Sequence, residues 1–181
     1  MHLERYQQYL LLLARAHFNK GLKKKVAPSD IVQQTLLKAY QAREQLRGKE
    51  SMQVAGWLRK ILVRTMCDAA RDLHRDKWNV DLERSLESAV GRSSVRLENL
   101  IPADQPTPSH AVAHEEQLLR LAEAIESLPE AQRDAVIMKH CEELSLEEVG
   151  KRLGRSTAGV ASVLRRGLKQ LREQLQNSSV L

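Results

Sequence analysis

Residues 145–172 carry the pattern of two short helices joined by a tight turn. Ser145 and Glu148 have the S-x-x-E spacing of a capping box, which predicts a helix that begins at Leu146. Gly154 is expected to end this helix, because glycine tolerates the left-handed conformation found just past a helix terminus. The turn that follows is therefore short and well defined.

The second of these helices is predicted to have two chemically distinct faces. Ser156 or Thr157 can cap its start by accepting backbone N–H bonds. At 100° per residue, apolar side chains gather on one side and cations on the other. The apolar set is Val160, Val163, Leu164, Leu168, Leu171 and Leu175, and the cationic set is Arg155, Arg165, Arg166, Lys169 and Arg172. One face is expected to pack and the other to meet phosphate.

The spacing of Gly150, Gly154 and Val160 lets the two helices cross closely, as in a helix-turn-helix that lays its second helix in the major groove of DNA. The alternative is an ordinary amphipathic hairpin with a solvated basic face. A further helix is predicted upstream, because Ser127 and Glu130 repeat the capping-box spacing. Three helices of this kind can bury a shared core.

Helical periodicity continues through the whole chain, which predicts an all-α fold. The composition, 42% hydrophobic and 29% charged, is typical of a soluble globular protein. Three of the five prolines fall within 102–108, after a GRSS stretch at 91–94. We therefore predict two helical domains, residues 1–80 and 111–181, joined by a flexible, acidic and proline-containing linker at residues 81–110.

Charge is distributed unevenly along the chain. Residues 1–78 hold 16 Lys and Arg against 7 Asp and Glu, residues 79–126 hold 4 against 9, and residues 127–181 hold 9 against 7. Basic segments gain affinity for nucleic acid by displacing counterions from phosphate, whereas an acidic connector avoids the duplex or occupies a basic channel in a partner. The alternative is that the charge serves solubility alone.

Several classes of protein are disfavoured by the sequence. The longest apolar run, Tyr9–Ala14, is too short to span a membrane, and Glu4 without a following small-residue cleavage site disfavours a signal peptide. A cytoplasmic location is expected. Cys67 and Cys141 lack the spacing of a zinc site or a disulfide framework. No Walker loop, H-E-x-x-H or nucleophile elbow occurs, so no catalytic residue, metal, cofactor or enzymatic activity is expected.

In the N-terminal half, Pro-Ser-Asp at 28–30 opens a predicted helix. Its periodicity leaves Gln33, Gln34 and Lys38 facing outward, as a polar surface that either pairs with another protein or remains solvated.

After a polar loop at 47–56, another helix is expected to begin near Trp57, whose ring is assigned to the core. Four cations of this helix fall within a stripe about 60° wide and form a basic ridge suited to a phosphate backbone: Lys60, Arg64, Arg71 and Arg75. The alternative for this ridge is a solvated helix face.

The order of these motifs resembles a known family. The runs PSDIVQQTLLKAY, WLRKILVRTMCDAAR, LPEAQRDAVIMKH, SLEEVGKRLGRS and VLRRGLKQLRE, with a tether after the second, are similar to a bacterial sigma factor of the extracytoplasmic-function (ECF) class. The sub-patterns RSLE, SS followed by R-L-E, and GRS followed by RRGL resemble the planctomycete type. Such proteins bind core RNA polymerase and direct it to promoters.

The resemblance implies three functional surfaces. The surface that docks on the clamp helices of the largest polymerase subunit would be Asp30, Ile31, Val32, Gln33, Gln34 and Thr35. The surface that captures a flipped base of the minus-10 element and holds the strands would be Arg47, Lys49, Ser51, Gln53, Lys60, Arg64, Arg71 and Arg75. The surface that enters the major groove of the minus-35 element would be Arg155, Ser156, Thr157, Ala158, Ala161, Ser162, Arg165, Arg166 and Lys169. Further partners implied are the flap of the second-largest polymerase subunit and an anti-sigma factor, with no membrane.

Some positions depart from the family pattern. The usual small-Thr-Val-Lys-Ser-Arg stretch of the reading helix appears here at 158–163 as Ala-Gly-Val-Ala-Ser-Val, which removes a threonine and two basic residues. The asparagine expected after Ile-Leu in the third N-terminal helix is also replaced, near Arg64 and Thr65. Aromatic residues make up only 3% of the chain, and Trp78 is the one candidate for base stacking past the ridge.

Two other functions fit parts of the sequence. An autonomous transcriptional regulator would need a self-complementary apolar face and palindromic half-sites. A nuclease would need clustered carboxylates, but Asp68 and Asp72 lie beside the basic ridge and are expected to be ion-pair partners.

The linker length bears on mechanism. A tether of about 30 residues typically spans about 30 Å, whereas promoter elements two turns apart lie about 70 Å from each other. The polymerase, rather than the tether, is therefore expected to set the domain spacing, with the free chain compact.

Overall fold

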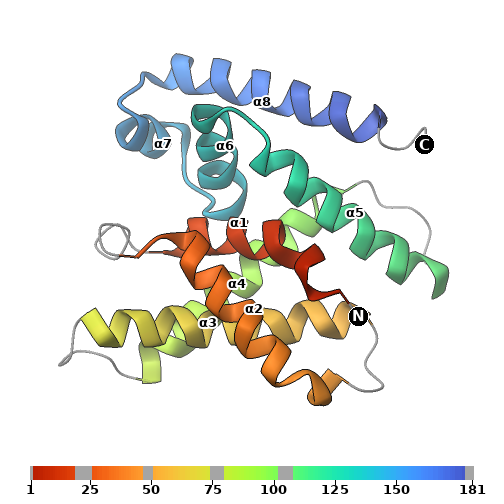
Figure 1. Ribbon diagram of the computed structural model, residues 1–181. Helices are drawn as coiled ribbons and strands as arrows, with labels where there is room; N and C mark the ends of the chain where they lie inside the picture. The colour runs from red at the N-terminus through yellow and green to blue at the C-terminus, as the bar shows by residue number, and fades with distance from the viewer. Residues whose placement is uncertain (1, 19–25, 47–50, 74–79, 102–107, 178–181) are drawn as a thin grey trace.

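The computed structural model describes residues 2–18, 26–46, 51–73, 80–101 and 108–177. In these ranges the regular structure is helical and contains no strand, which confirms the all-α prediction. The elements, shown in Figure 1, are η1 (Leu3–Tyr6), α1 (Gln7–His17), α2 (Pro28–Gln41), η2 (Arg43–Leu46), α3 (Ser51–Leu73), α4 (Val80–Glu98), α5 (Pro108–Glu126), α6 (Glu130–Val136), η3 (Ile137–Cys141), α7 (Leu146–Leu153) and α8 (Thr157–Asn177).

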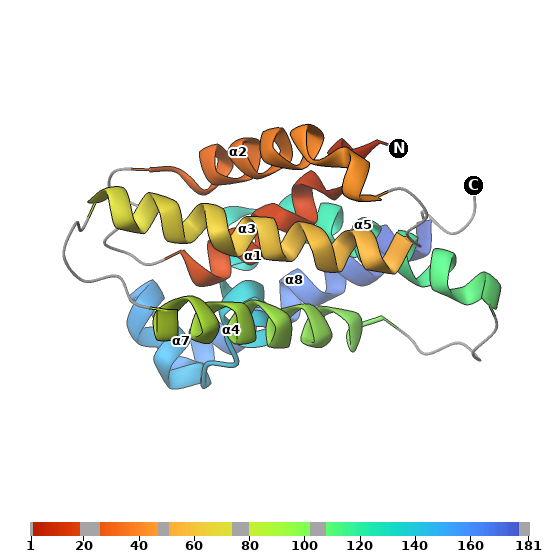
Figure 2. The same cartoon turned by 90° about the horizontal axis from the view of Figure 1, so that it is seen from below.

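Helix α1 is the centre of the structure. It contacts α2, α3, α4, α5 and η3, and both views place it between the layers formed by the other helices (Figures 1 and 2). A helix covered on most sides must be apolar on most sides. The run of residues 9–14 meets this need, because five of its six side chains are buried: Tyr9, Leu10, Leu12, Leu13 and Ala14.

Helices α2 and α3 pack against each other and against α1. Pro28 occupies the first turn of α2, and the Asp30 carboxylate accepts a hydrogen bond from the backbone N–H of Ala27 at 3.3 Å, as expected for a residue that satisfies a free donor at a helix start. Helix α3 begins at Ser51, six residues before the predicted start at Trp57. The physical reason is that Val54 already lies on the buried face of the helix.

The segment expected to be a coil, residues 81–110, differs from that prediction. Residues Val80–Glu98 form α4, and α5 begins at Pro108. The prolines of this segment all follow residue 101, and upstream of them Leu86, Val90 and Leu97 recur at helical spacing. Val90 and Leu97 are buried at 1% exposure each, so packing stabilises a helix that polar composition alone did not indicate.

The C-terminal helices form a compact group in which α8 contacts α5, α6 and α7. Helix α6 starts at Glu130 after Pro129, and the predicted capping box of Ser127 is wrong, because the Ser127 hydroxyl donates to the Ala124 carbonyl instead. The next element, η3, is a π-helical turn in which the Glu142 N–H donates to the Ile137 carbonyl at 3.1 Å.

The two predicted domain segments, 1–80 and 111–181, pack against each other. Helix α1 contacts α5 and η3, α3 contacts α5, and buried apolar side chains from both segments form one continuous cluster. Among the described residues, no helix is both long and apolar enough to cross a lipid bilayer.

Candidate nucleic-acid interface

The start and end of α7 are fixed by local hydrogen bonds, as the sequence predicted. The Ser145 hydroxyl accepts a bond from the Glu148 N–H at 3.2 Å, and the Glu148 carboxylate accepts one from the Ser145 N–H at 2.8 Å. These bonds from Ser145 lower the pKa of Glu148. At the other end, Gly154 adopts the left-handed conformation with φ of 63°, which completes the predicted turn.

The close crossing of α7 and α8 depends on Gly150. A Cβ atom at this position would lie 2.6 Å from the backbone oxygen of Arg155 and 3.7 Å from Cγ2 of Val160. The Arg155 N–H donates to the Gly150 carbonyl at 2.9 Å, so the turn is fastened at its closest point. The Ser156 hydroxyl then accepts a bond from the Gly159 N–H at 3.2 Å, which caps α8.

Helix α8 turns its cations to solvent. Its apolar positions Val160, Val163, Leu164 and Leu171 are buried. The side opposite this stripe is exposed and constitutes what we call the α8 face: Arg155, Ser156, Thr157, Ala158, Ala161, Arg165, Arg166 and Lys169. Ser162, the remaining residue predicted for this surface, is half-buried. The arrangement presents guanidinium and ammonium groups along one side of a helix, as phosphate contacts require.

A second basic surface lies on α3. Lys60, Arg64 and Arg71 are exposed and form what we call the α3 ridge. Asp68 accepts bonds from Lys38 of α2 at 2.8 Å and from Arg71 at 3.1 Å, which confirms its prediction as an ion-pair partner. Lys38, which was expected to face solvent, is therefore joined to α3.

Other residues predicted for the minus-10 surface are placed less completely. Ser51 and Gln53 lie by their backbone in the first turn of α3 rather than in a loop. Arg47, Lys49, Arg75 and Trp78 lie outside the described residues.

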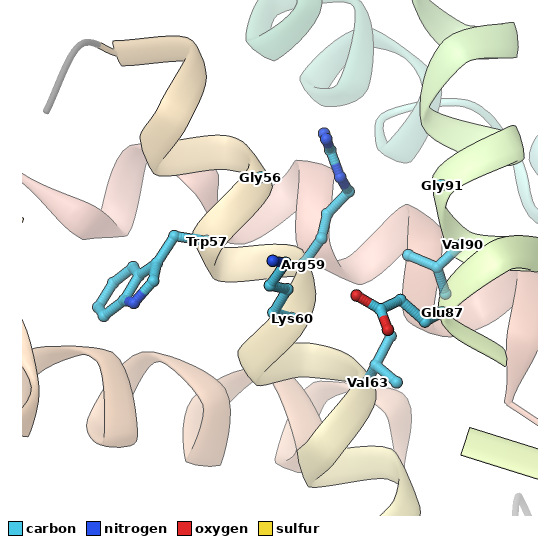
Figure 3. A pocket seen from close by; sticks show the side chains of 8 residues that line it. All are labelled: Gly56, Trp57, Arg59, Lys60, Val63, Glu87, Val90 and Gly91. Atoms are coloured by element: carbon cyan, nitrogen blue, oxygen red, sulfur yellow. The ribbon is translucent and has the colours of Figure 1, made fainter. Parts of the chain in front are cut away.

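A groove of about 410 Å³ runs between α3 and α4, beside the α3 ridge. In Figure 3, Trp57 and Lys60 extend from α3, while Glu87 extends from α4 toward the side where Lys60 and Val63 lie. The indole N–H of Trp57 donates to the side-chain oxygen of Gln45 at 3.3 Å, and its ring is only partly buried rather than a full member of the core.

The exposed face of α2 is narrower than the predicted docking surface. Asp30, Gln33 and Gln34 are exposed. In contrast, Ile31, Val32 and Thr35 are at most 1% exposed, and the Thr35 hydroxyl donates to the Ile31 carbonyl. The prediction that these three residues contact a partner is therefore corrected, because they are on the face of α2 that packs on the core.

Sequence reasoning missed one residue of this face. Leu37 is 59% exposed, the largest exposure of any large hydrophobic side chain among the described residues. It lies one helical turn after Gln33, and this spacing is the signal that could have identified it. We call Gln33, Gln34 and Leu37 the α2 face.

Comparison with known proteins matches both basic surfaces to one family. A model described as sigma-70 region 2 matches residues 3–76, and one described as sigma-70, region 4 matches residues 118–171. The first match contains the α2 face and the α3 ridge, and the second contains α7 and most of α8. Helix α4 lies between the two matches.

Individual relatives agree. The RNA polymerase sigma-E factor of Streptomyces coelicolor is 30% identical over 83% of this chain and 72% of its own length. The ECF RNA polymerase sigma factor SigW of Bacillus subtilis is 27% identical over 82% of this chain and 75% of its own. The ECF RNA polymerase sigma factor SigG of Mycobacterium tuberculosis is 30% identical over 94% of this chain but 46% of its own, so the chain spans about half the length of some relatives it matches. On these matches and this helical architecture, the chain belongs to the ECF family of RNA polymerase sigma factors.

Proposed function

We propose that the protein binds core RNA polymerase and directs it to promoters. The observation that carries this proposal is that two separate cationic surfaces, the α3 ridge and the α8 face, coincide with the matches to sigma-70 region 2 and region 4. The charge needed to hold DNA backbone is thus present at two points on one chain. The proposed partners are core polymerase and promoter DNA, in the cytoplasm.

The α2 face is the proposed docking surface for the clamp helices of the largest polymerase subunit. Two exposed amides offer donors and acceptors to a polar partner helix, and Leu37 offers an apolar anchor between them. Asp30 supports this surface from the helix start, where its carboxylate is already occupied by the Ala27 N–H.

The α8 face is proposed to enter the major groove of the minus-35 element, with contact to the polymerase flap nearby. Its residues 158–163 are small or apolar rather than basic, so phosphate contacts from Arg155, Arg165, Arg166 and Lys169 are expected to supply most of the affinity. The minus-10 element is assigned to the α3 ridge, together with Arg47, Lys49, Ser51, Gln53 and Arg75.

Two finer assignments belong to the same proposal. The motifs RSLE at 84–87, SS at 93–94 followed by R-L-E, and RRGL at 165–168 support the planctomycete type of ECF factor. An anti-sigma factor is proposed as an additional partner by the same family resemblance.

The direct test is transcription with purified components. Core polymerase is incubated with the organism's fragmented genomic DNA, with and without the chain, and new transcripts are mapped by sequencing. We expect the chain to add transcripts that start at a shared pair of sequence elements. A set of transcripts that does not change when the chain is added would refute the proposal.

The docking surface is tested by substitution. Gln33→Ala with Leu37→Asp is expected to reduce copurification with core polymerase at least tenfold while the far-ultraviolet circular dichroism is unchanged, because both side chains are exposed. The matched control is Gln117→Ala, an exposed glutamine of α5, which should copurify as the parent chain does.

A further inference from the structure

Helix α4 is fastened to both halves of the chain by hydrogen bonds that it makes on opposite sides of one turn. It lies between the segments that match sigma-70 region 2 and region 4 and belongs to neither match. Its buried polar side chains are Ser93 and Ser94, at 0% and 1% exposure. Buried hydroxyls require partners, and each of these serines finds them in a different half of the chain.

Ser94 joins α4 to the N-terminal helices. Arg59 of α3 donates to the Tyr9 hydroxyl at 2.8 Å and to the Ser94 hydroxyl at 2.9 Å. Ser94 donates its own hydrogen to Glu98 at 2.9 Å, so Tyr9 must be the donor in the 2.8 Å contact between Tyr9 and Ser94. Burial raises the pKa of Tyr9, which keeps this hydroxyl protonated. The network therefore runs through three helices with a cation at one end and a carboxylate at the other.

Ser93 joins α4 to the C-terminal helices. Its hydroxyl donates to the Cys141 carbonyl at the end of η3, at 2.6 Å. His17 of α1 lies 2.8 Å from the same hydroxyl through Nε2, and must donate because the hydroxyl hydrogen is already used. Arg96, one turn of α4 further on, donates to the same Cys141 carbonyl at 3.0 Å.

The Arg96 guanidinium also pairs with Glu143, which lies just before α7. Glu143 has φ of 62° and is the one non-glycine residue in the left-handed region among the described residues. A residue with a side chain is held in this conformation only where its surroundings enforce it. The ion pair with α4 is such a constraint, and it acts at the entrance to the helix-turn-helix.

The position of α4 also places acidic side chains beside α3. Glu87 lines the same groove as Lys60, and the Glu83 charge contributes to the raised pKa of Cys67 on α3. Carboxylates in this position compete with phosphate for the α3 ridge.

The arrangement that α4 closes is too short for a promoter. Helix α5 contacts both α3 and α8, so these two helices are separated by one intervening helix, or about 20 Å at 8–10 Å per packed pair. Promoter elements two turns apart lie about 70 Å from each other. As drawn in Figure 1, the α3 ridge and the α8 face cannot occupy both elements at once.

We propose that Ser93, Ser94 and Arg96 form a clasp, the α4 clasp, that holds the free chain closed and must release before the two basic surfaces reach both promoter elements. The inference rests on the proposed function, which supplies the two elements. The α2 face is exposed in the closed arrangement, so polymerase docking precedes release of the α4 clasp.

A reversible cross-link tests the α4 clasp. Ser93→Cys places a thiol beside Cys141, because the native side chain already contacts the Cys141 backbone. On oxidation we expect the disulfide-linked chain to remain bound to core polymerase or to bind it more weakly, and promoter-dependent RNA synthesis to fall at least tenfold. Reduction should restore it. The matched control, Ser93→Cys with Cys141→Ser, should be insensitive to the oxidant. A cross-linked chain that transcribes as well as its reduced form would overturn the proposal.

Spin-label distances give a second test that does not depend on the disulfide. Labels on Gln7→Cys of α1 and Glu130→Cys of α6, both exposed, report the separation of the two halves, since both native cysteines are buried. One short distance is expected for the free chain and a shift of tens of ångströms with core polymerase and promoter DNA. Arg96→Ala should broaden the distribution of the free chain, whereas Arg84→Ala, an exposed arginine of α4, should not.

The outcomes separate the two proposals. A reduced chain that fails to bind polymerase refutes the proposed function, and the distance distribution of the free chain with and without Arg96→Ala still decides whether α4 holds it closed. A distance that is unchanged in the transcribing complex refutes the α4 clasp while leaving the proposed function intact.

Discussion

The Tyr6 hydroxyl donates a hydrogen bond to the Glu115 carboxylate, which joins η1 to α5 across 109 positions of the chain. Both residues are at most 3% exposed. Burial, followed by the bond to Glu115, raises the pKa of Tyr6, so the phenol remains a donor at all physiological pH values. A carboxylate buried in this way depends on its one strong donor.

Tyr6→Phe is therefore expected to destabilise the protein by about 2–3 kcal/mol, because it leaves the Glu115 carboxylate buried without that donor. Urea denaturation followed by circular dichroism measures the change. The double variant Tyr6→Phe with Glu115→Leu should recover most of the loss, since it removes both polar groups. Equal stability of the two variants would show that the bond has no special weight.

Protein stability is expected to depend on the ionisation of His17. Burial, with added repulsion from Arg92 and Arg96, lowers the pKa of His17 from 6.5 to about 4. The unfolded chain binds this proton more readily, so stability is present above pH 6.5 and is lost as pH falls toward about 4, by up to about 3 kcal/mol.

Denaturation midpoints across this pH range test the His17 prediction. His17→Gln can still donate to Ser93 but does not titrate, so its stability should vary less between pH 6.5 and 4 than that of the parent. A parallel slope in both proteins would assign the acid sensitivity to other groups.

Two glycines provide a matched pair of alanine substitutions. Gly150→Ala would place a Cβ 2.6 Å from a backbone oxygen that cannot move aside, and should cost about 2 kcal/mol or more. Gly91→Ala, inside α4, meets nothing within 4 Å and should stabilise the protein by up to about 1 kcal/mol. Thermal melts of the two variants should therefore move in opposite directions.

The contacts of the α8 face are expected to be mainly electrostatic. Arg165→Ala and Lys169→Ala should each weaken binding of the polymerase complex to all promoters to a similar degree and reduce the slope of log affinity against log salt by about 1. Arg5→Ala, on the exposed surface of η1, is the matched control and should leave the slope unchanged. Fluorescence anisotropy over a salt series gives the slope. A variant that loses affinity for one promoter only would instead indicate base readout.

The helix-turn-helix could be predicted from the sequence because its signals are local. Ser145, Glu148, Gly150 and Gly154 each act within a few residues of their own positions, and each behaves as predicted. Capping spacing was not sufficient everywhere, since Ser127 has the same spacing and bonds to the preceding turn.

What the sequence did not predict depends on distant contacts. The helical state of α4 requires Val90 and Leu97 to meet a surface built by α1, α3 and η3. The docking surface was predicted as a continuous run, whereas a helix alternates its faces, so Ile31, Val32 and Thr35 are in the core and Leu37 was overlooked. Pairs such as Tyr6 and Glu115 leave no local trace in the sequence.

The π-helical turn η3 has a consequence for how this chain tolerates changes in length. A turn with an i→i+5 bond contains one residue more than its α-helical equivalent. Deleting that residue would restore α-helical winding and rotate everything downstream by about 100° about the helix axis. The orientation of α7 and α8 toward the rest of the molecule is thus set in discrete angular steps, like the teeth of a gear, and drift by single insertions or deletions is barred at this point.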